Sequence, residues 1–283
     1  MSLSKKLSLI SIFQFILNFF PFLFGARLGL QSGPQEAVTT IHNFLPPTEF
    51  FSSYIIPGKP VLFKGVATRF PAYHKWTDEY FKSIPESKDF LVDVEEGKKE
   101  NRKDGARTLP FSEFIDIYKH EDIYCVNQLP SFLAHDFPLP LSLDCPSVID
   151  LIEDNVMWFS SGGTKSVWHN DAYENLNCLF RGKKEFIMAN RSEGVEKVHI
   201  DVDDESYSSV DVDNVDVEKY PGFKTTTFFN VTMESGDCLY IPWLWFHTVS
   251  SQERFKEKII GDQNDWQNLC STTRGMGSAT GIP

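Results

Sequence analysis

Two histidines and an aspartate have the spacing of a metal site. His169 and Asp171 are separated by one residue. Side chains two apart on a β-strand point to the same face, so one strand can present both to one ion. His247 lies in a second stretch of strand character, 245–249, and could supply a third ligand. Two histidines and one carboxylate that leave the other metal positions open form the facial triad of non-heme Fe(II) oxygenases.

A second triplet has the same spacing. His199 and Asp201 are also separated by one residue, and the chain holds seven histidines and 39 acidic residues, so spacing alone does not identify a site. Residues 203–205 continue as Asp-Asp-Glu, which is typical of a solvated loop rather than of a packed strand. The surroundings of each triplet must therefore decide between them.

The segments around His169 have the pattern of short strands joined by turns. Residues 160–163 are Ser-Ser-Gly-Gly, a turn, and 166–169 then have strand character. Residues 175–180 and 185–188 have strand character on either side of an Arg-Gly turn. Lys184 directly precedes the last of these strands, where its ammonium could meet an anion near the metal. These surroundings favour the first triplet.

Two segments resemble the JmjC (jumonji C) family. One is 158–177, which contains the first triplet, and the other is 234–247, which ends in Trp-Phe-His. The similarity extends roughly over residues 40–250 and is to the small cupin-like protein hydroxylases of that family rather than to its large multidomain histone demethylases. It implies a mainly β fold, a double-stranded β-helix (jelly-roll, cupin-like) with flanking N-terminal helices. It also implies bound Fe(II) with 2-oxoglutarate as co-substrate.

The resemblance assigns roles to the polar residues of these segments. His169, Asp171 and His247 match the iron ligands, which are the catalytic residues. Lys184 matches the lysine that pairs with the distal carboxylate of 2-oxoglutarate, and Ser166 matches a hydroxyl that binds the same carboxylate. An ammonium and a hydroxyl can both donate to a carboxylate, and such charge-assisted hydrogen bonds are shorter and stronger than neutral ones.

Two further residues match the co-substrate pocket of the family. Asn175 matches a polar residue on the strand beside the metal, close to the co-substrate. Tyr124 resembles a tyrosine that often contributes to this pocket, and a core position is the alternative for it. The expected cofactor-binding residues are therefore Lys184, Ser166, Asn175 and Tyr124.

The charge of the chain limits its partners. The 283 residues carry a formal net charge of −12 and no basic run of useful length. Phosphate binding depends on clustered lysine and arginine, so the composition argues against nucleic acid and favours a protein or peptide substrate, a basic one in particular. The acidic stretch 201–218 is expected to be a solvated insertion between barrel strands, with a docking loop for a basic substrate as the alternative.

The first 26 residues have the pattern of a targeting segment. Lys5 and Lys6 precede an apolar run over 7–26, as in a secretory signal peptide, and the run is also long enough for a membrane anchor. We therefore expect the endoplasmic reticulum lumen or secretion, with membrane anchoring by residues 7–26 as the alternative. Glycosylation sequons begin at Asn190 and Asn230, and they support this expectation only if the two asparagines are exposed.

The five cysteines show no zinc or redox spacing. Cys178 and Cys238 lie in predicted strands and are expected to be small core residues. Cys125 and Cys145 could pair in an oxidising compartment.

Four regions follow from these patterns: the leader 1–26, an N-terminal helical and strand region 27–140 that packs on the barrel, the catalytic barrel 141–255, and an atypical tail 256–283 that need not be ordered. The second region should hold helices at 49–54, 77–84 and 110–119 and a strand at 59–65, with Ser112 as an N-cap. JmjC domains usually continue after the distal histidine into an apolar strand that helps to close the barrel. The tail here is polar and glycine-rich and does not have that pattern.

Two classes of function remain open. The triad and Lys184 favour an Fe(II)- and 2-oxoglutarate-dependent dioxygenase that hydroxylates a protein side chain, and the resemblance favours lysyl hydroxylation over demethylation. The missing strand pattern favours a catalytically reduced JmjC-fold binding or regulatory protein of the secretory pathway. It also puts the activity of this form in question.

Overall fold

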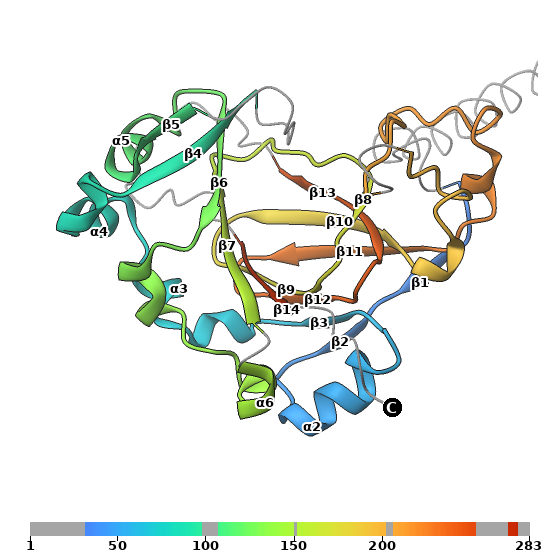
Figure 1. Ribbon diagram of the computed structural model, residues 1–283, viewed down its shortest axis with the longest axis horizontal. Coiled ribbons are helices and arrows are strands. Elements are labelled where there is room, and N and C mark those ends of the chain that lie inside the picture. The colour runs from blue at the N-terminus through green and yellow to red at the C-terminus, as the bar shows by residue number, and fades with distance from the viewer. Residues whose placement is uncertain (1–31, 98–106, 150–151, 202–205, 253–270, 277–283) are drawn as a thin grey trace, which may run out of the picture.

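A computed structural model describes residues 32–97, 107–149, 152–201, 206–252 and 271–276 (Figure 1). Two β-sheets form the body of the protein, and the helices of the N-terminal half gather beside them (Figure 1). The leader 1–26 lies outside the described residues. Within the described part of the chain, no helix is long and apolar enough to cross a membrane.

The smaller sheet has five strands. Their order is β1 (Gln35–Ala37), β11 (Phe228–Glu234), β10 (Lys183–Ala189), β13 (Phe246–Ser251) and β8 (His169–Asn170). All neighbours are antiparallel except β1 and β11. Its strands β10 and β11 run horizontally through the centre of Figure 1.

The larger sheet has nine strands, in the order β2 (Thr39–Ile41), β3 (Val61–Phe63), β12 (Cys238–Ile241), β9 (Glu174–Leu179), β14 (Ser271–Met276), β7 (Ile152–Ser160), β6 (Ile123–Gln128), β4 (Leu91–Glu96) and β5 (Arg107–Pro110). Strands β9 and β12 of this sheet alternate along the chain with β8, β10, β11 and β13 of the smaller one. The predicted double-stranded β-helix with N-terminal helices is confirmed.

The α-helices are short: α2 (Pro47–Phe50), which continues as a π-helical turn over Phe51–Ile55, α3 (Pro71–Lys75), α4 (Asp78–Ser83), α5 (Phe111–Ile117) and α6 (Pro146–Ile149). Helix α4 begins after Thr77, whose hydroxyl accepts a hydrogen bond from the Tyr80 N–H, so the predicted helix start is confirmed. Ser112 is not the N-cap of α5, because Pro110 takes that position with φ −59° and ends the preceding strand.

An aromatic core joins these helices to the larger sheet. Phe159 of β7 contacts Phe81 of α4, Phe114 of α5 and Tyr118 at ring-centroid distances of 5.9, 5.2 and 4.8 Å. All four rings are buried. Burial of each such side chain stabilises the fold by about 1.5–3 kcal/mol, so this layer holds the outer face of the larger sheet rigidly.

The segment between β10 and β11 is an insertion with an apolar side. Val210, Val212 and Val215 are buried, whereas Asp211 and Asp213 are exposed. The valines pack in one cluster with Trp168 and Phe246, the residues that directly precede His169 and His247. The segment is the expected insertion between barrel strands with exposed acidic side chains, and its valines in addition bury one apolar side, which the acidic composition does not indicate.

The tail contains a strand of the larger sheet. Residues Ser271–Met276 form β14, which pairs antiparallel with β7 on one side and with β9 on the other. The expectation that residues 256–283 supply no barrel strand was therefore wrong. A strand paired on both edges is held by its backbone hydrogen bonds. The tail residues on either side of β14 lie outside the described residues.

Cys178 and Cys238 lie in strands and are buried in the core, as expected, but they are also bonded to each other, which was not expected. The disulfide joins β9 to β12, whereas Cys125 and Cys145 are not bonded to each other. The reason is register: Cys178 and Cys238 lie directly opposite each other on antiparallel strands, with Cα atoms 4.0 Å apart. Cys270 lies outside the described residues.

Candidate metal centre

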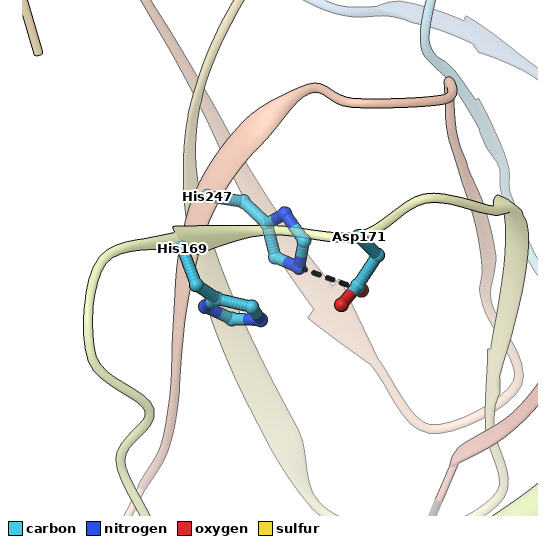
Figure 2. Close-up of side chains that lie close together, drawn as sticks. All are labelled: His169, Asp171 and His247. Carbon is cyan, nitrogen blue, oxygen red and sulfur yellow. Dashed lines mark ion pairs between the residues drawn. The ribbon is translucent and has the colours of Figure 1, made fainter. Parts of the chain in front are cut away.

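His169 and His247 lie directly opposite each other on the antiparallel strands β8 and β13. Their ring centroids are 4.1 Å apart, and Asp171 is the residue directly after β8. The three side chains converge on one space (Figure 2). Their candidate ligand atoms all lie within 4.8 Å of one another, and within the described residues this is the only such group of three. One ion between them could contact all three.

Both imidazoles are held in the tautomer that a metal requires. Nδ1 of His169 is 2.8 Å from the Val167 carbonyl oxygen, and Nδ1 of His247 is 3.0 Å from that of Trp245. A ring that donates from Nδ1 presents the lone pair of Nε2. Burial, reinforced by the neighbouring His169, lowers the pKa of His247 to about 4, so this ring is neutral at pH 7 and able to bind a metal.

Asp171 is oriented by the strand that follows it. The side-chain amide of Asn175, in β9, donates to Asp171 Oδ2 at 2.9 Å, and His247 Nε2 lies 3.5 Å from the same oxygen. Asn175 thus acts on a metal ligand, in addition to lining the cavity beside the triad. The set of two imidazoles, each with Nδ1 engaged, and a hydrogen-bonded carboxylate fits Fe(II).

In the rival triplet, His199 and Asp201 contact each other, and they are not part of a group of three ligands among the described residues. His199 Nε2 lies 3.2 Å from Asp201 Oδ2, and Asp201 also accepts hydrogen bonds from the Ser209 backbone and hydroxyl. The His199 ring packs on Tyr220 at 4.5 Å. These contacts stabilise the insertion.

A cavity of about 80 Å³ opens beside the triad. About 10–15 Å³ is enough for one water, so this space accommodates several waters or a small anion. Its walls include the triad and the four residues predicted to bind the co-substrate: Lys184, Ser166, Asn175 and Tyr124. The structure therefore brings every predicted site residue to one place.

Lys184 is the cation of this cavity that lies deepest. Its side chain, on β10, is 9% exposed, and Nζ is 5.7 Å from the ring centroid of Trp158. An ammonium donates strong charge-assisted hydrogen bonds to carboxylates, so this position suits a carboxylate ligand. Ser166 Oγ accepts a hydrogen bond from the Val249 N–H at 2.9 Å, which lets its own hydroxyl hydrogen point into the cavity.

Sequence reasoning missed several residues of the cavity wall, among them Trp158, Thr164, Lys165 and Asn177. Asn177 lies two residues after Asn175 on β9, so the period of a strand could have found it. Lys165 forms an ion pair with Asp213 of the insertion. That contact joins segments 48 residues apart in sequence, and no local pattern indicates it.

Two facing sheets that enclose a His-Asp-His triad beside a buried lysine define a cupin-type oxygenase scaffold. Residues 47–263 match the family described as the cupin-like domain, and the chain belongs to that family. It is similar to the human bifunctional peptidase and (3S)-lysyl hydroxylase JMJD7, with 26% identity over 74% of this chain and 79% of that protein.

Other relatives have different named activities. Lysine-specific demethylase 8 of Xenopus tropicalis is 27% identical over 76% of this chain and 50% of its own length. The tRNA wybutosine-synthesizing protein 5 of Gallus gallus is 26% identical over 69% of this chain and 67% of its own. The expected likeness to JmjC proteins is confirmed. The family and the triad together support 2-oxoglutarate-dependent oxygenase activity.

Proposed function

We propose that this protein is an Fe(II)- and 2-oxoglutarate-dependent dioxygenase that hydroxylates a protein side chain, with lysine as the favoured target. One observation carries the proposal. The His169–Asp171–His247 group, with both Nδ1 atoms engaged, shares its cavity with the buried ammonium of Lys184. A metal site and an anion site side by side are what a chelating dicarboxylate needs.

The residues divide the work between them. Nε2 of both histidines and the Asp171 carboxylate would hold the metal, and the Lys184 ammonium and the Ser166 hydroxyl would bind the distal carboxylate of 2-oxoglutarate. When bound, Fe(II) and 2-oxoglutarate supply the oxidation, in which dioxygen gives one oxygen atom to succinate, with release of CO₂, and one to a substrate C–H bond. Trp158, Phe186 and Val249 line the cavity and limit the entry of water.

The favoured substrate is a basic segment of a protein. The net charge of −12 opposes binding to nucleic acid. Asp211, Asp213 and Asp216 are exposed on the insertion, and Asp213 forms an ion pair with Lys165 of the cavity wall, so this acidic segment contacts the wall of the site. The human relative is named a lysyl hydroxylase and the Xenopus relative a demethylase. Likeness to the small hydroxylases favours hydroxylation.

Turnover with a peptide library tests this function. Purified protein with Fe(II), 2-oxoglutarate and ascorbate should form succinate and add one oxygen atom to a lysine-containing peptide, as seen by mass spectrometry. His169→Ala should form neither product. Metal and 2-oxoglutarate binding without succinate formation would contradict the enzyme and favour the binding or regulatory protein.

We further propose that the chain enters the secretory pathway, either through a cleaved leader or anchored by residues 7–26. Asn230 and Thr232 of one sequon are exposed on β11, Asn190 of the other is partly exposed, and a disulfide suits an oxidising compartment. Expression in eukaryotic cells should give an endoglycosidase-sensitive form that Asn230→Gln reduces by one glycan. A cytosolic, unglycosylated chain with an intact N-terminus would contradict this proposal.

A further inference from the structure

The turn between β12 and β13 has an unusual backbone. It spans residues 242–245, and Leu244 has a φ of 57°, in the left-handed region that a leucine rarely adopts. Such a conformation is strained and persists only where the surrounding contacts impose it. Because His247 follows this turn by two residues, whatever imposes the turn also sets the position of a metal ligand.

Glu174 supplies the side-chain contacts that hold this turn. Its Oε2 accepts a hydrogen bond from the Trp243 N–H at 3.0 Å and another from the Tyr240 hydroxyl. Tyr240 is 1% exposed, so the second bond is shielded from water. The guanidinium of Arg191 lies 4.7 Å from the Trp243 ring centroid and covers the outer side of the turn.

The same turn contacts two of the three metal ligands. The Leu244 N–H donates to the Asp171 carbonyl oxygen at 2.9 Å, and this bond ties the turn to the end of β8. The Trp245 carbonyl accepts from His247 Nδ1 at 3.0 Å, and this bond fixes the tautomer and orientation of the ring. Glu174 lies three residues after Asp171, so one short segment carries both the carboxylate ligand and the group that holds the turn.

From these contacts we infer that Glu174 is a positioning residue for the metal centre. It acts through the backbone of Trp243 and Leu244 and holds His247 and Asp171 in register with each other. It is not one of the ligands, since its carboxylate is engaged by Tyr240 and Trp243. The inference depends on the proposed metal site but not on any particular substrate.

Asp136 provides a matched control. It is a buried carboxylate that also accepts from a tyrosine hydroxyl and an N–H group, those of Tyr80 and Trp76. Tyr80 belongs to α4 and Trp76 is the residue that follows α3, and none of the hydrogen bonds of Asp136 to described residues reaches the turn before β13. Removing Asp136 should destabilise the fold without moving a metal ligand.

The test measures Mn(II) affinity and amide hydrogen exchange of the full chain. Partners that orient metal ligands contribute about 10–100-fold to metal affinity, so Glu174→Ala should weaken Mn(II) binding by that factor and speed exchange at Trp243 and Leu244 in the apo protein. Glu174→Gln, which keeps an oxygen acceptor, should recover most of the affinity. Asp136→Ala should lower the melting temperature and leave Mn(II) affinity within about twofold, because no metal ligand is affected.

Several results would overturn the inference. One is wild-type Mn(II) affinity in Glu174→Ala, and another is an equal loss of affinity in Asp136→Ala, which would indicate general destabilisation. If Glu174→Ala does not fold, Glu174→Asp is used in its place. The shorter side chain keeps the charge but withdraws the acceptor from Trp243. Wild-type Mn(II) affinity in that variant would also refute the inference. A wild-type chain that binds no Mn(II) would refute the metal site and this inference together.

Discussion

The two sheets contribute different chemistry to the same cavity. The five-stranded sheet supplies the ligand histidines and the buried cation, namely His169, His247 and Lys184. The nine-stranded sheet supplies neutral side chains, namely Tyr124, Trp158, Asn175 and Asn177. The ligand histidines and the buried cation thus come from one wall, whereas the other wall shapes the cavity and carries Asn175 and Glu174, which contact Asp171 and the turn before β13. Substitutions on the two walls should have separable effects.

The two sheets are also supported differently. Strand β8 has only two residues, and it is held by β13 on one side and by the insertion on the other, where His169 lies opposite Tyr207 in a single bridge. The His169 ring stacks on that of Tyr207 at 5.8 Å. In the larger sheet, β9 is held by β12, by β14 and by the disulfide from Cys178 to Cys238.

The largest effect is expected for the metal ligands. His169→Ala and Asp171→Ala should each abolish Mn(II) binding, which should be about one ion per chain in the wild type, because two ligands cannot replace a facial triad. Calorimetric titration measures this. His199→Ala is the matched control and should bind normally. Unchanged binding in both ligand variants would locate the metal elsewhere.

A substitution of Lys184 should affect 2-oxoglutarate binding but not Mn(II) binding. Lys184→Ala should weaken 2-oxoglutarate binding to the Mn(II)-loaded protein by about 1.5–3 kcal/mol, the contribution of a charged hydrogen bond, and leave Mn(II) affinity unchanged. Lys183→Ala is the control, because Lys183 does not line the cavity. Wild-type 2-oxoglutarate affinity in Lys184→Ala would remove this lysine from the site.

The larger sheet should respond to a break in β14. Thr273 lies opposite Val156 of β7 and Asn177 of β9, and Thr273→Pro removes a backbone donor from the centre of this strand. We expect a lower melting temperature and weaker 2-oxoglutarate binding, with a smaller change in Mn(II) affinity. Thermal melting and titration check this, with Thr273→Ala as the control, because alanine keeps the backbone N–H. If Thr273→Pro melts like the wild type, β14 does not close the barrel.

The sequence was sufficient for the triad and the co-substrate residues because they occupy motif segments of the family. Local spacing places His169 and Asp171 within one ion's reach, and the match extends to Lys184 and Ser166. Glu174 could not be found in this way. Its role depends on contacts with Tyr240 and Trp243, 66 and 69 residues away, which only the packing of β9 beside β12 creates.

The sequence predicts the fold class, a jelly roll, but it does not identify the strand that closes the barrel. Alternating short strands indicate a jelly roll, but β14 lacks the apolar pattern that marks a closing strand. A strand that is paired on both sides by backbone hydrogen bonds need not show that pattern. The disulfide was missed for a related reason, since the register of Cys178 opposite Cys238 depends on how two strands 60 residues apart align.

Asp136 should have the smallest effect on the site, because it belongs to the helical layer rather than to either cavity wall. Burial opposes its ionisation, but hydrogen bonds from Lys75, Tyr80 and Trp76 outweigh this and lower its pKa below the usual value. A carboxylate with a lowered folded-state pKa stabilises the fold above its unfolded pKa, and this contribution is lost as the pH falls through the folded pKa.

Asp136→Asn should therefore reduce the free energy of unfolding at pH 7 by about 1–3 kcal/mol, and the difference from wild type should shrink in acid. Urea unfolding of both proteins from pH 7 to 3 measures this. A constant difference across that range would show that Asp136 acts by shape rather than by charge, and a parallel loss of Mn(II) affinity would show that the helical layer and the metal centre are coupled.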